Sequence, residues 1–314
     1  MYIGVDIGGT NVAVAIVDQH GHILHKGETP TKVDRPFEDI MRDIATLINK
    51  LVKESDYKQE DIIAIGVGSP GLPDKENGTI VFANNLDWYN VPVRAELQKY
   101  FNVPIHIEND GNTAGLAEAV AGACQGVNNS ITLTLGTGIG AGIIIEGKPY
   151  SGSHSVGAEL GHMVVHMNGI MCTCGNKGCW ERYASATALI REGKEGAKEN
   201  PESLIYKSVK GNLDEITAKT VIDAAKEGDE LALEIFDTYI DYLSMGIITI
   251  INSFDPAIIA FGGGVAKAGD FLMDALKKEV QKNIFYKEAE YAKIVMAVLG
   301  NDAGVIGAAM LGKI

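Results

Sequence analysis

Cysteines are scarce in this chain. Only four occur among 314 residues, too few for a disulfide framework, so we expect a reducing compartment. No apolar run is long enough to span a bilayer, and no secretory leader is recognisable at Met1. These absences favour a cytoplasmic protein without a membrane partner. No cluster of lysine and arginine interrupts the formal net charge of −14, which disfavours nucleic acid as a partner.

Strands and helices alternate along the chain, whose length exceeds that of a typical single core. The expected strands are 2–7, 12–17, 23–27, 62–67, 104–107 and 258–261, with hairpins around Asn77-Gly78 and over 131–145. The expected helices are 36–54, 112–122, 183–197, 217–227 and 230–254. Because both halves contain a hairpin built on a glycine-rich turn, we expect an internally duplicated α/β architecture.

Three of the four cysteines cluster ten residues and more after a histidine. Cys172, Cys174 and Cys179 together with His162 make a complete tetrahedral ligand set for zinc. Four protein ligands leave no open position for substrate, so we expect a structural Zn²⁺ ion. The alternative is three free thiols in a loop. Glycines at 175 and 178 allow tight folding, and the carboxylates Glu159 and Glu181 flank the cluster, so the metal would aim them.

Two glycine-rich turns are candidate phosphate loops. In Asp6-Ile7-Gly8-Gly9-Thr10-Asn11 the next strand follows at once, which predicts a hairpin and not a P-loop. Backbone N–H groups at Gly8 and Gly9 and the Thr10 hydroxyl could bind phosphate, although a tight hairpin explains the glycines equally well. The loop Leu135–Gly142 favours phosphate, because glycine stabilises a strand poorly, and Thr137 with Gly138 would donate to it.

Polar residues also follow buried strands. Because ligands bind beyond the carboxyl ends of strands in open α/β sheets, we expect Gly71, Asn109 and Asp110 to face one ligand. From the residues alone, an Asn-Asp-Gly triplet is also a common turn. Asp6 is a candidate Mg²⁺ ligand or a turn-capping carboxylate. The run Gly262-Gly263-Gly264 could admit adenosine or pack a helix on the sheet.

Taken together, these motifs resemble the ROK family of sugar kinases, and within it the bacterial glucokinases, over nearly the whole chain. The residues that carry the resemblance are Asp6-Ile7-Gly8-Gly9-Thr10, Glu108-Asn109-Asp110, Leu135-Gly136-Thr137-Gly138-Ile139-Gly140, Gly157-Ala158-Glu159-Leu160-Gly161-His162, Cys172 to Glu181 and Gly262-Gly263-Gly264-Val265. The resemblance implies a two-lobed actin-like (ribonuclease-H-like) α/β fold with a central ligand cleft. The lobes would comprise residues 1–116 plus 300–314 and residues 117–299, with helix 303–312 completing the first lobe and a homodimer formed through the second.

The resemblance also implies roles for the candidate residues. Asp110 would be the general base that accepts the sugar hydroxyl proton. Groups that would bind the sugar are Gly71, Asn85, Asn109, Asp110, Glu159, His162 and Glu181. Groups that would bind ATP and Mg²⁺ are Asp6, Gly8, Gly9, Thr10, Thr137, Gly138, Gly262, Gly263 and Gly264.

The expected reaction is ATP-dependent phosphorylation of glucose to glucose 6-phosphate. The same residues could orient N-acetylmannosamine, N-acetylglucosamine or fructose. The family also includes sugar-sensing repressors, but we see no room for a helix-turn-helix before Tyr2 and the charge is unfavourable for DNA. An actin-like ATPase is a third possibility, which would not require sugar-binding carboxylates on a zinc loop.

Overall fold

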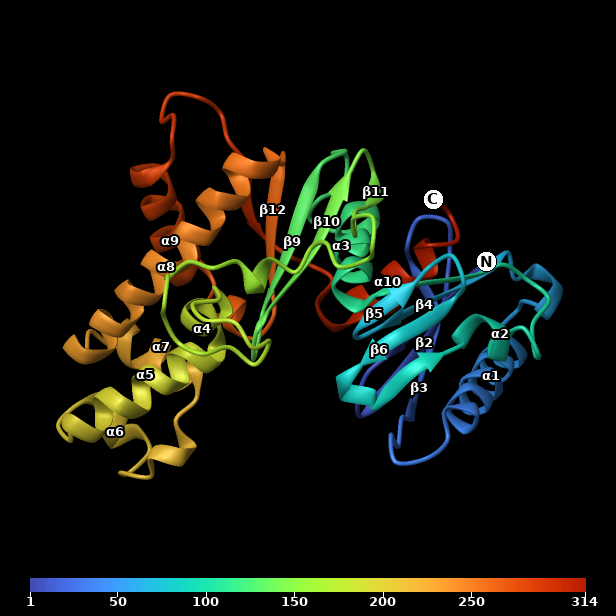
Figure 1. The fold of residues 1–314 in the computed structure, drawn as a ribbon, viewed down its shortest axis with the longest axis horizontal. Helices are drawn as coiled ribbons and strands as arrows, with labels where there is room; N and C mark the ends of the chain where they lie inside the picture. Colours follow the sequence, from blue (N-terminus) through green and yellow to red (C-terminus); the bar gives the residue numbers. More distant parts are fainter. The chain divides into compact units, whose positions relative to one another are not determined.

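The computed structural model describes residues 1–314, and the chain divides into two compact units (Figure 1). Unit 1 consists of Met1–Thr132, Gly142–Ala158 and Ala297–Ile314, and unit 2 of Leu133–Ala141 and Glu159–Met296. The first unit therefore extends beyond the expected boundary at residue 116. Glu118 gives the reason: its buried carboxylate accepts the backbone N–H groups of Val298 and Leu299, which ties helix α3 (Asp110–Ala121) to the C-terminal segment.

Unit 1 is built on a five-stranded sheet of order β3-β2-β1-β4-β8. The strands are β1 Tyr2–Ile7, β2 Asn11–Val17, β3 Ile23–Pro30, β4 Ala64–Ser69 and β8 Ile105–Asn109. β1 pairs antiparallel with β2, with Ile7 opposite Val12, which confirms the predicted hairpin. β1, β4 and β8 are parallel, so their carboxyl ends lie at one edge of the sheet.

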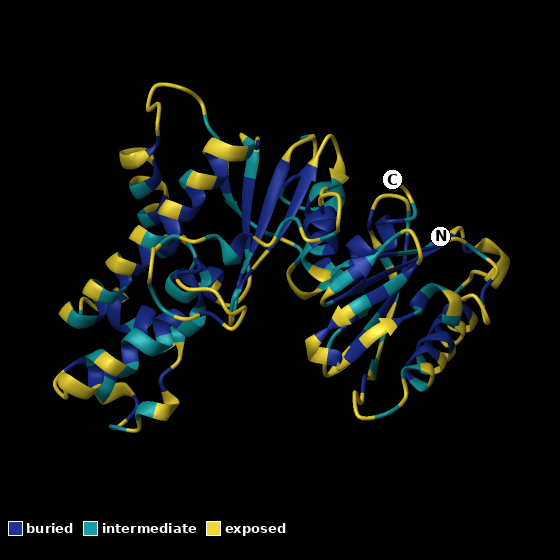
Figure 2. Ribbon diagram, viewed as in Figure 1, coloured by how far each residue is buried: buried dark blue, intermediate teal, exposed yellow.

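Helices cover both faces of this sheet. On β1, Ile3, Val5 and Ile7 belong to the same core as the apolar face of α1 (Phe37–Glu54), which has buried and exposed residues along its length (Figure 2). The alternate residues of β1 face α10 (Ala303–Met310), whose backbone lies so close that a side chain at Gly4 would collide with it. The expected C-terminal helix therefore packs on the first unit, as the resemblance implied.

A small second sheet of order β5-β6-β7 lies within the same unit. It consists of β5 Leu72–Asp74, β6 Thr79–Ala83 and β7 Trp88–Val91, followed by helix α2 Val93–Leu97. The predicted turn at Asn77-Gly78 joins β5 to β6, with Gly78 at φ +71° and Asp74 accepting from Asn77. Sequence periodicity had not indicated β7.

The other five-stranded sheet has the order β11-β10-β9-β12-β13. Its strands are β9 Ser130–Leu135, β10 Ile139–Ile145, β11 Lys148–Pro149, β12 Ile258–Gly262 and β13 Lys293–Met296. The order repeats that of the first sheet, with a three-stranded meander followed by two later strands. This repetition confirms the predicted duplication.

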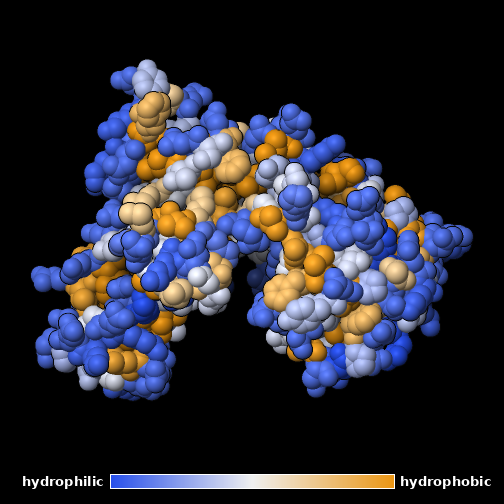
Figure 3. All heavy atoms as spheres, viewed as in Figure 1, coloured by the Kyte–Doolittle hydropathy of each residue, from blue (hydrophilic) through white to orange (hydrophobic).

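Helices form most of unit 2. They are α4 Glu181–Ala184, α5 Ala186–Glu199, α6 Leu204–Ser208, α7 Ala218–Lys226, α8 Glu230–Phe254 and α9 Asp270–Asn283. Asp229 caps α8 by accepting from the N–H of Ala232, so this helix begins and ends as predicted. None of the helices is both long and apolar enough to cross a membrane. Hydrophilic side chains make up most of the surface seen in Figure 3, with smaller hydrophobic areas between them.

Candidate active site and metal centre

Asp110 is the first residue of α3, directly after the carboxyl end of β8. The helix starts two residues earlier than expected, because Asn109 is an N-cap whose side-chain oxygen accepts the N–H of Gly111 at 2.8 Å. The Asp110 carboxylate also accepts from Gly111, at 2.9 Å, and it reaches solvent. Desolvation by the surrounding protein raises the pKa of Asp110 above its ordinary value, opposed by the Gly111 hydrogen bond.

Asn109 joins this junction to Gly71. Its side-chain nitrogen donates to the Gly71 carbonyl oxygen at 3.0 Å, so the structure brings these two predicted sugar ligands together. Gly71 has φ +92°, and a Cβ there would collide with the carbonyl of Phe82, so only glycine suits the position.

Asp6 lies on the same face of β1 as Gly4, toward the start of α10. A Cβ at Gly304 would collide with the Asp6 carboxylate, so the glycine makes room for it. Desolvation, followed by the negative charge of Asp110, raises the pKa of Asp6 to about 6, and Lys26 opposes the change. Because the charge of Asp110 disfavours ionisation of Asp6, a divalent cation would favour the ionised form of Asp6.

The Gly8-Gly9-Thr10 turn follows directly from Asp6 and is largely exposed. The N–H of Gly8 donates to the Asn11 carbonyl at 2.9 Å, and the Thr31 hydroxyl donates to the Gly8 carbonyl at 2.6 Å. The carbonyl of Asn85 would lie 3.4 Å from a Cβ at Gly9. Unit 1 therefore gathers Asp6, this turn and Asn85.

Unit 2 holds the second glycine loop at the beginning of α5. The N–H of Ala186 donates to the Gly136 carbonyl at 2.8 Å, and the Thr187 hydroxyl donates to the Thr137 carbonyl at 2.7 Å. Thr137 itself is exposed, and a Cβ at Gly138 would collide with the Glu181 carboxylate. The loop is thus fixed from behind while its Thr137 side chain stays accessible.

The predicted zinc ligands converge. The ligand atoms of His162, Cys172, Cys174 and Cys179 all lie within 4.8 Å of one another. Cys174 Sγ and Cys179 Sγ are 3.6 Å apart, and His162 Nδ1 is 3.7 Å from Cys172 Sγ. A tetrahedral zinc ion with sulfur ligands at about 2.3 Å requires ligand separations near these values.

Backbone geometry supports the metal centre. Gly175 and Gly178 have φ +88° and +79°, as the predicted tight loop requires, and a Cβ at Gly178 would collide with the His166 carbonyl. Desolvation and the neighbouring thiols raise the pKa of Cys179, and a bound cation would favour the thiolate instead. Glu181 Oε1 lies 3.1 Å from Cys172 Sγ and 3.8 Å from His162 Nδ1. The cluster therefore holds Glu181 beside the second glycine loop.

The third glycine run follows β12. Gly262 ends the strand, and Gly263 has φ +89° with its α-carbon against the backbone of Leu135. A Cβ at Gly264 would meet no neighbouring atom, so space remains there. Gly263 is explained by close backbone packing, whereas Gly264 is not.

The predicted site residues divide between the two units. Unit 1 holds Asp6, Gly8, Gly9, Thr10, Gly71, Asn85, Asn109 and Asp110. Unit 2 holds Thr137, Gly138, Glu159, His162, Cys172, Cys174, Cys179, Glu181, Gly262, Gly263 and Gly264.

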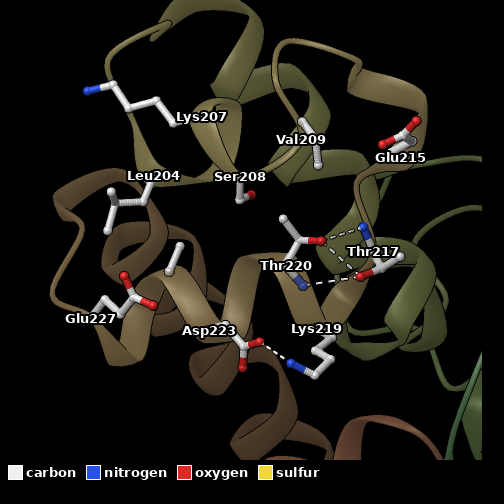
Figure 4. Close-up of a pocket in the computed structure, with 11 residues that line it drawn as sticks. Leu204, Lys207, Ser208, Val209, Glu215, Thr217, Lys219, Thr220, Asp223 and Glu227 are labelled. Atoms are coloured by element: carbon white, nitrogen blue, oxygen red, sulfur yellow. Dashed lines mark hydrogen bonds and ion pairs between the residues drawn. The ribbon is translucent and has the colours of Figure 1, made fainter.

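A cavity of about 670 Å³ in unit 2 contains none of them (Figure 4). It lies between α6 and α7, where Thr217 and Thr220 cap α7 and Lys219 pairs with Asp223. These polar groups stabilise the helix and need no ligand to explain them.

Two residues near the predicted site have no role that the sequence motifs indicate. Gly304 makes room for Asp6, and only the structure places the start of α10 there. Glu108 is 2% exposed and hydrogen-bonded at the β8–α3 junction. Its place in the Glu108-Asn109-Asp110 motif is the signal that could have drawn attention to it.

Comparisons with known proteins agree with the sequence motifs. The ROK family model matches residues 2–314. A glucokinase from Thermotoga maritima is 41% identical over 312 residues, covering 99% of this chain and 96% of that protein. A crystal structure of a ROK family glucokinase from Streptomyces griseus, in complex with glucose and AMPPNP, is 35% identical with a TM-score of 0.80 and covers 99% of both chains.

Similarity extends beyond kinases. A xylose repressor from Caldicellulosiruptor bescii is 32% identical over 305 residues, covering 97% of this chain and 76% of that protein. Similarity to the glucokinases confirms the predicted resemblance, and the solved structure confirms the two-lobed actin-like α/β fold. The chain therefore belongs to the ROK family.

Proposed function

We propose that this protein is a glucokinase that transfers the terminal phosphoryl group of ATP to the 6-hydroxyl of glucose. The observation that carries the proposal is the solvent-reaching Asp110 carboxylate at the β8–α3 junction, in a chain 41% identical to a glucokinase. A base must be accessible to the hydroxyl whose proton it accepts, and a raised pKa strengthens it.

The reaction requires a base, groups that orient the sugar and groups that bind phosphate. Asp110 accepts the 6-hydroxyl proton as the oxygen attacks the terminal phosphorus of ATP, so that proton ends on the carboxylate. The bond between that phosphorus and the bridging oxygen breaks, and ADP leaves. Sugar hydroxyls are oriented by Gly71, Asn85, Asn109, Glu159, His162 and Glu181. Asn109 does so from a fixed position, because its amide is anchored to Gly71. Both glycine loops donate N–H groups to phosphate oxygens, with the Thr10 and Thr137 hydroxyls beside them.

Two metals fit the residues present. Asp6, beside Asp110, would hold Mg²⁺ directly or through water, and the ion would neutralise charge on the phosphates. His162, Cys172, Cys174 and Cys179 would hold a structural Zn²⁺, which would fix His162 and Glu181. We further propose a cytoplasmic homodimer, with adenosine lying against Gly262, Gly263 and Gly264. The expected lobe assignment is retained as part of this proposal: the first phosphate loop and Asp110 belong to one lobe, and the second phosphate loop, the zinc ligands and the adenosine loop belong to the other.

A panel of hexoses with ATP and Mg²⁺ tests the function. We expect the highest kcat/KM for glucose and no phosphoryl transfer to 6-deoxyglucose, which lacks the attacking hydroxyl. Preference for N-acetylmannosamine, N-acetylglucosamine or fructose would reassign the substrate. Sugar binding without phosphoryl transfer would favour a sensor, and steady ATP hydrolysis without sugar would favour an ATPase.

A further inference from the structure

We infer that Glu108, paired with Lys75, is a positioning residue that fixes the direction of Asp110. The inference rests on the proposed function, since it concerns the group assigned as the general base. Glu108 immediately precedes Asn109 and Asp110, but its carboxylate points away from solvent and is only 2% exposed. It therefore does not meet the sugar and must act through its neighbours.

Three contacts define this role. Glu108 Oε1 accepts the backbone N–H of Asn109 at 2.9 Å and the side-chain nitrogen of Asn112 at 3.1 Å. Glu108 Oε2 forms an ion pair with Lys75, in the turn between β5 and β6. One carboxylate thus joins the end of β8, the first turn of α3 and the small sheet.

Asp110 lies between the two residues that Glu108 holds. Its own carboxylate oxygen is bonded to the adjacent Gly111 N–H, and its carbonyl accepts from the Thr113 hydroxyl. The direction of its side chain therefore follows the backbone of the first helical turn. Fixing Asn109 on one side and Asn112 on the other fixes that backbone.

Lys75 is itself held in place. The Arg94 guanidinium donates to the carbonyls of Lys75 at 2.6 Å, Glu76 at 2.7 Å and Ile105 at 2.9 Å, which joins the β5–β6 turn to the start of β8. The ammonium of Lys75 is thereby presented to Glu108 from a rigid support. Lys75, Arg94 and Glu108 line a cavity of about 300 Å³ together with His106 and Lys148.

The energetics favour positioning over stabilisation. Glu108 is buried whereas Lys75 is partly exposed, and an ion pair that removes a carboxylate from water often stabilises a fold no more than apolar residues of the same volume would. The arrangement also leaves the buried Asn112 Oδ1 without a hydrogen-bond partner, an unfavourable state for a polar atom. A network that adds little stability, while orienting the residues on either side of Asp110, is explained by a requirement for precise placement.

Glu108→Gln and Lys75→Met separate the possibilities. In Glu108→Gln the amide oxygen turns toward the Lys75 ammonium. The amide NH₂ then faces the N–H groups of Asn109 and Asn112, from which it cannot accept a hydrogen bond. We expect kcat for glucose to fall ~10- to 100-fold, the range for a misplaced catalytic group, with a smaller change in KM for glucose. In the double variant, Glu108→Gln with Lys75→Met, no ammonium attracts the amide oxygen. The oxygen can accept from Asn109 and Asn112 again, so kcat should exceed that of Glu108→Gln.

The matched control is Glu96→Gln, which removes a different Glu–Lys ion pair of the same unit, with Lys99, and should leave kcat unchanged. A merely structural role would make the double variant as impaired as the worse single variant, and that result would overturn the inference. Wild-type kcat in Glu108→Gln or in Lys75→Met would overturn it as well, and Lys75→Met decides the question if Glu108→Gln fails to fold. Wild-type protein that does not phosphorylate glucose would overturn the proposed function, and this inference with it.

Discussion

The Asp6 carboxylate should destabilise the protein when no Mg²⁺ is bound, and Asp6→Asn tests this. Desolvation and Asp110 raise its pKa from the ordinary 3.8 to about 6. That difference disfavours the ionised form by about 3 kcal/mol at most, and partial contact with solvent reduces the expected value to about 1–3 kcal/mol. Replacing the carboxylate with an uncharged amide removes this unfavourable term.

The contribution of Asp6 to stability depends on pH because the folded and unfolded states bind its proton differently. Between about pH 4 and pH 6 the folded state retains a proton on Asp6 that the unfolded chain has lost, so this group's contribution to stability falls as pH rises through that window. We expect Asp6→Asn to stabilise the protein fully above about pH 6 and less at about pH 5.

Urea unfolding at about pH 5 and about pH 8, in buffer without Mg²⁺, measures the effect. Asp18→Asn is the control of opposite sign, because hydrogen bonds from His22 and His20 outweigh desolvation and hold the pKa of Asp18 at about 2. Its stabilising contribution is present above that range, so this variant should be less stable at neutral pH. Equal effects of Asp6→Asn at both pH values, or destabilisation at about pH 8, would refute the reasoning.

Two further predictions concern the metal centre and the start of α10. Cys174→Ser should release zinc, which metal analysis measures. It should strongly lower kcat/KM for glucose, since His162 and Glu181 lose their support, while the melting temperature changes little. Full glucose affinity in the metal-free variant would contradict the role of the cluster. Gly304→Ala should lower activity ~10- to 100-fold, because the new methyl group displaces the Asp6 carboxylate. This loss is expected although alanine is the better helix former. Unchanged activity would show that Asp6 tolerates the displacement.

Much of the fold could be predicted because local patterns and tertiary packing agree. The long helix Glu230–Phe254 has an N-cap at Asp229, and α1 has a continuous apolar face, so both were located from sequence. The first hairpin was also predictable, since a strand follows the glycine turn without a break. β7 was not, because its pattern of buried ends around two exposed residues lacks alternation.

The convergence of the candidate metal ligands could be predicted for a different reason. Cysteine is rare in this chain and three of the four cysteines cluster after His162, so their spacing singles out a candidate zinc site. Glu108 could not, because sequence reasoning places carboxylates at the surface unless a partner is known, and Lys75 lies more than thirty residues away. The contact of Glu181 with Gly138 likewise depends on folding of the zinc loop against β10, which no local pattern encodes.

The central claim is that Asp110 accepts the hydroxyl proton of glucose. Its most direct test is the kcat of Asp110→Asn, measured alongside glucose affinity and zinc content. We expect kcat to fall ~100-fold or more, the effect of losing a general base, while the variant still folds, retains its zinc and binds glucose. Turnover close to that of the wild type would contradict the account.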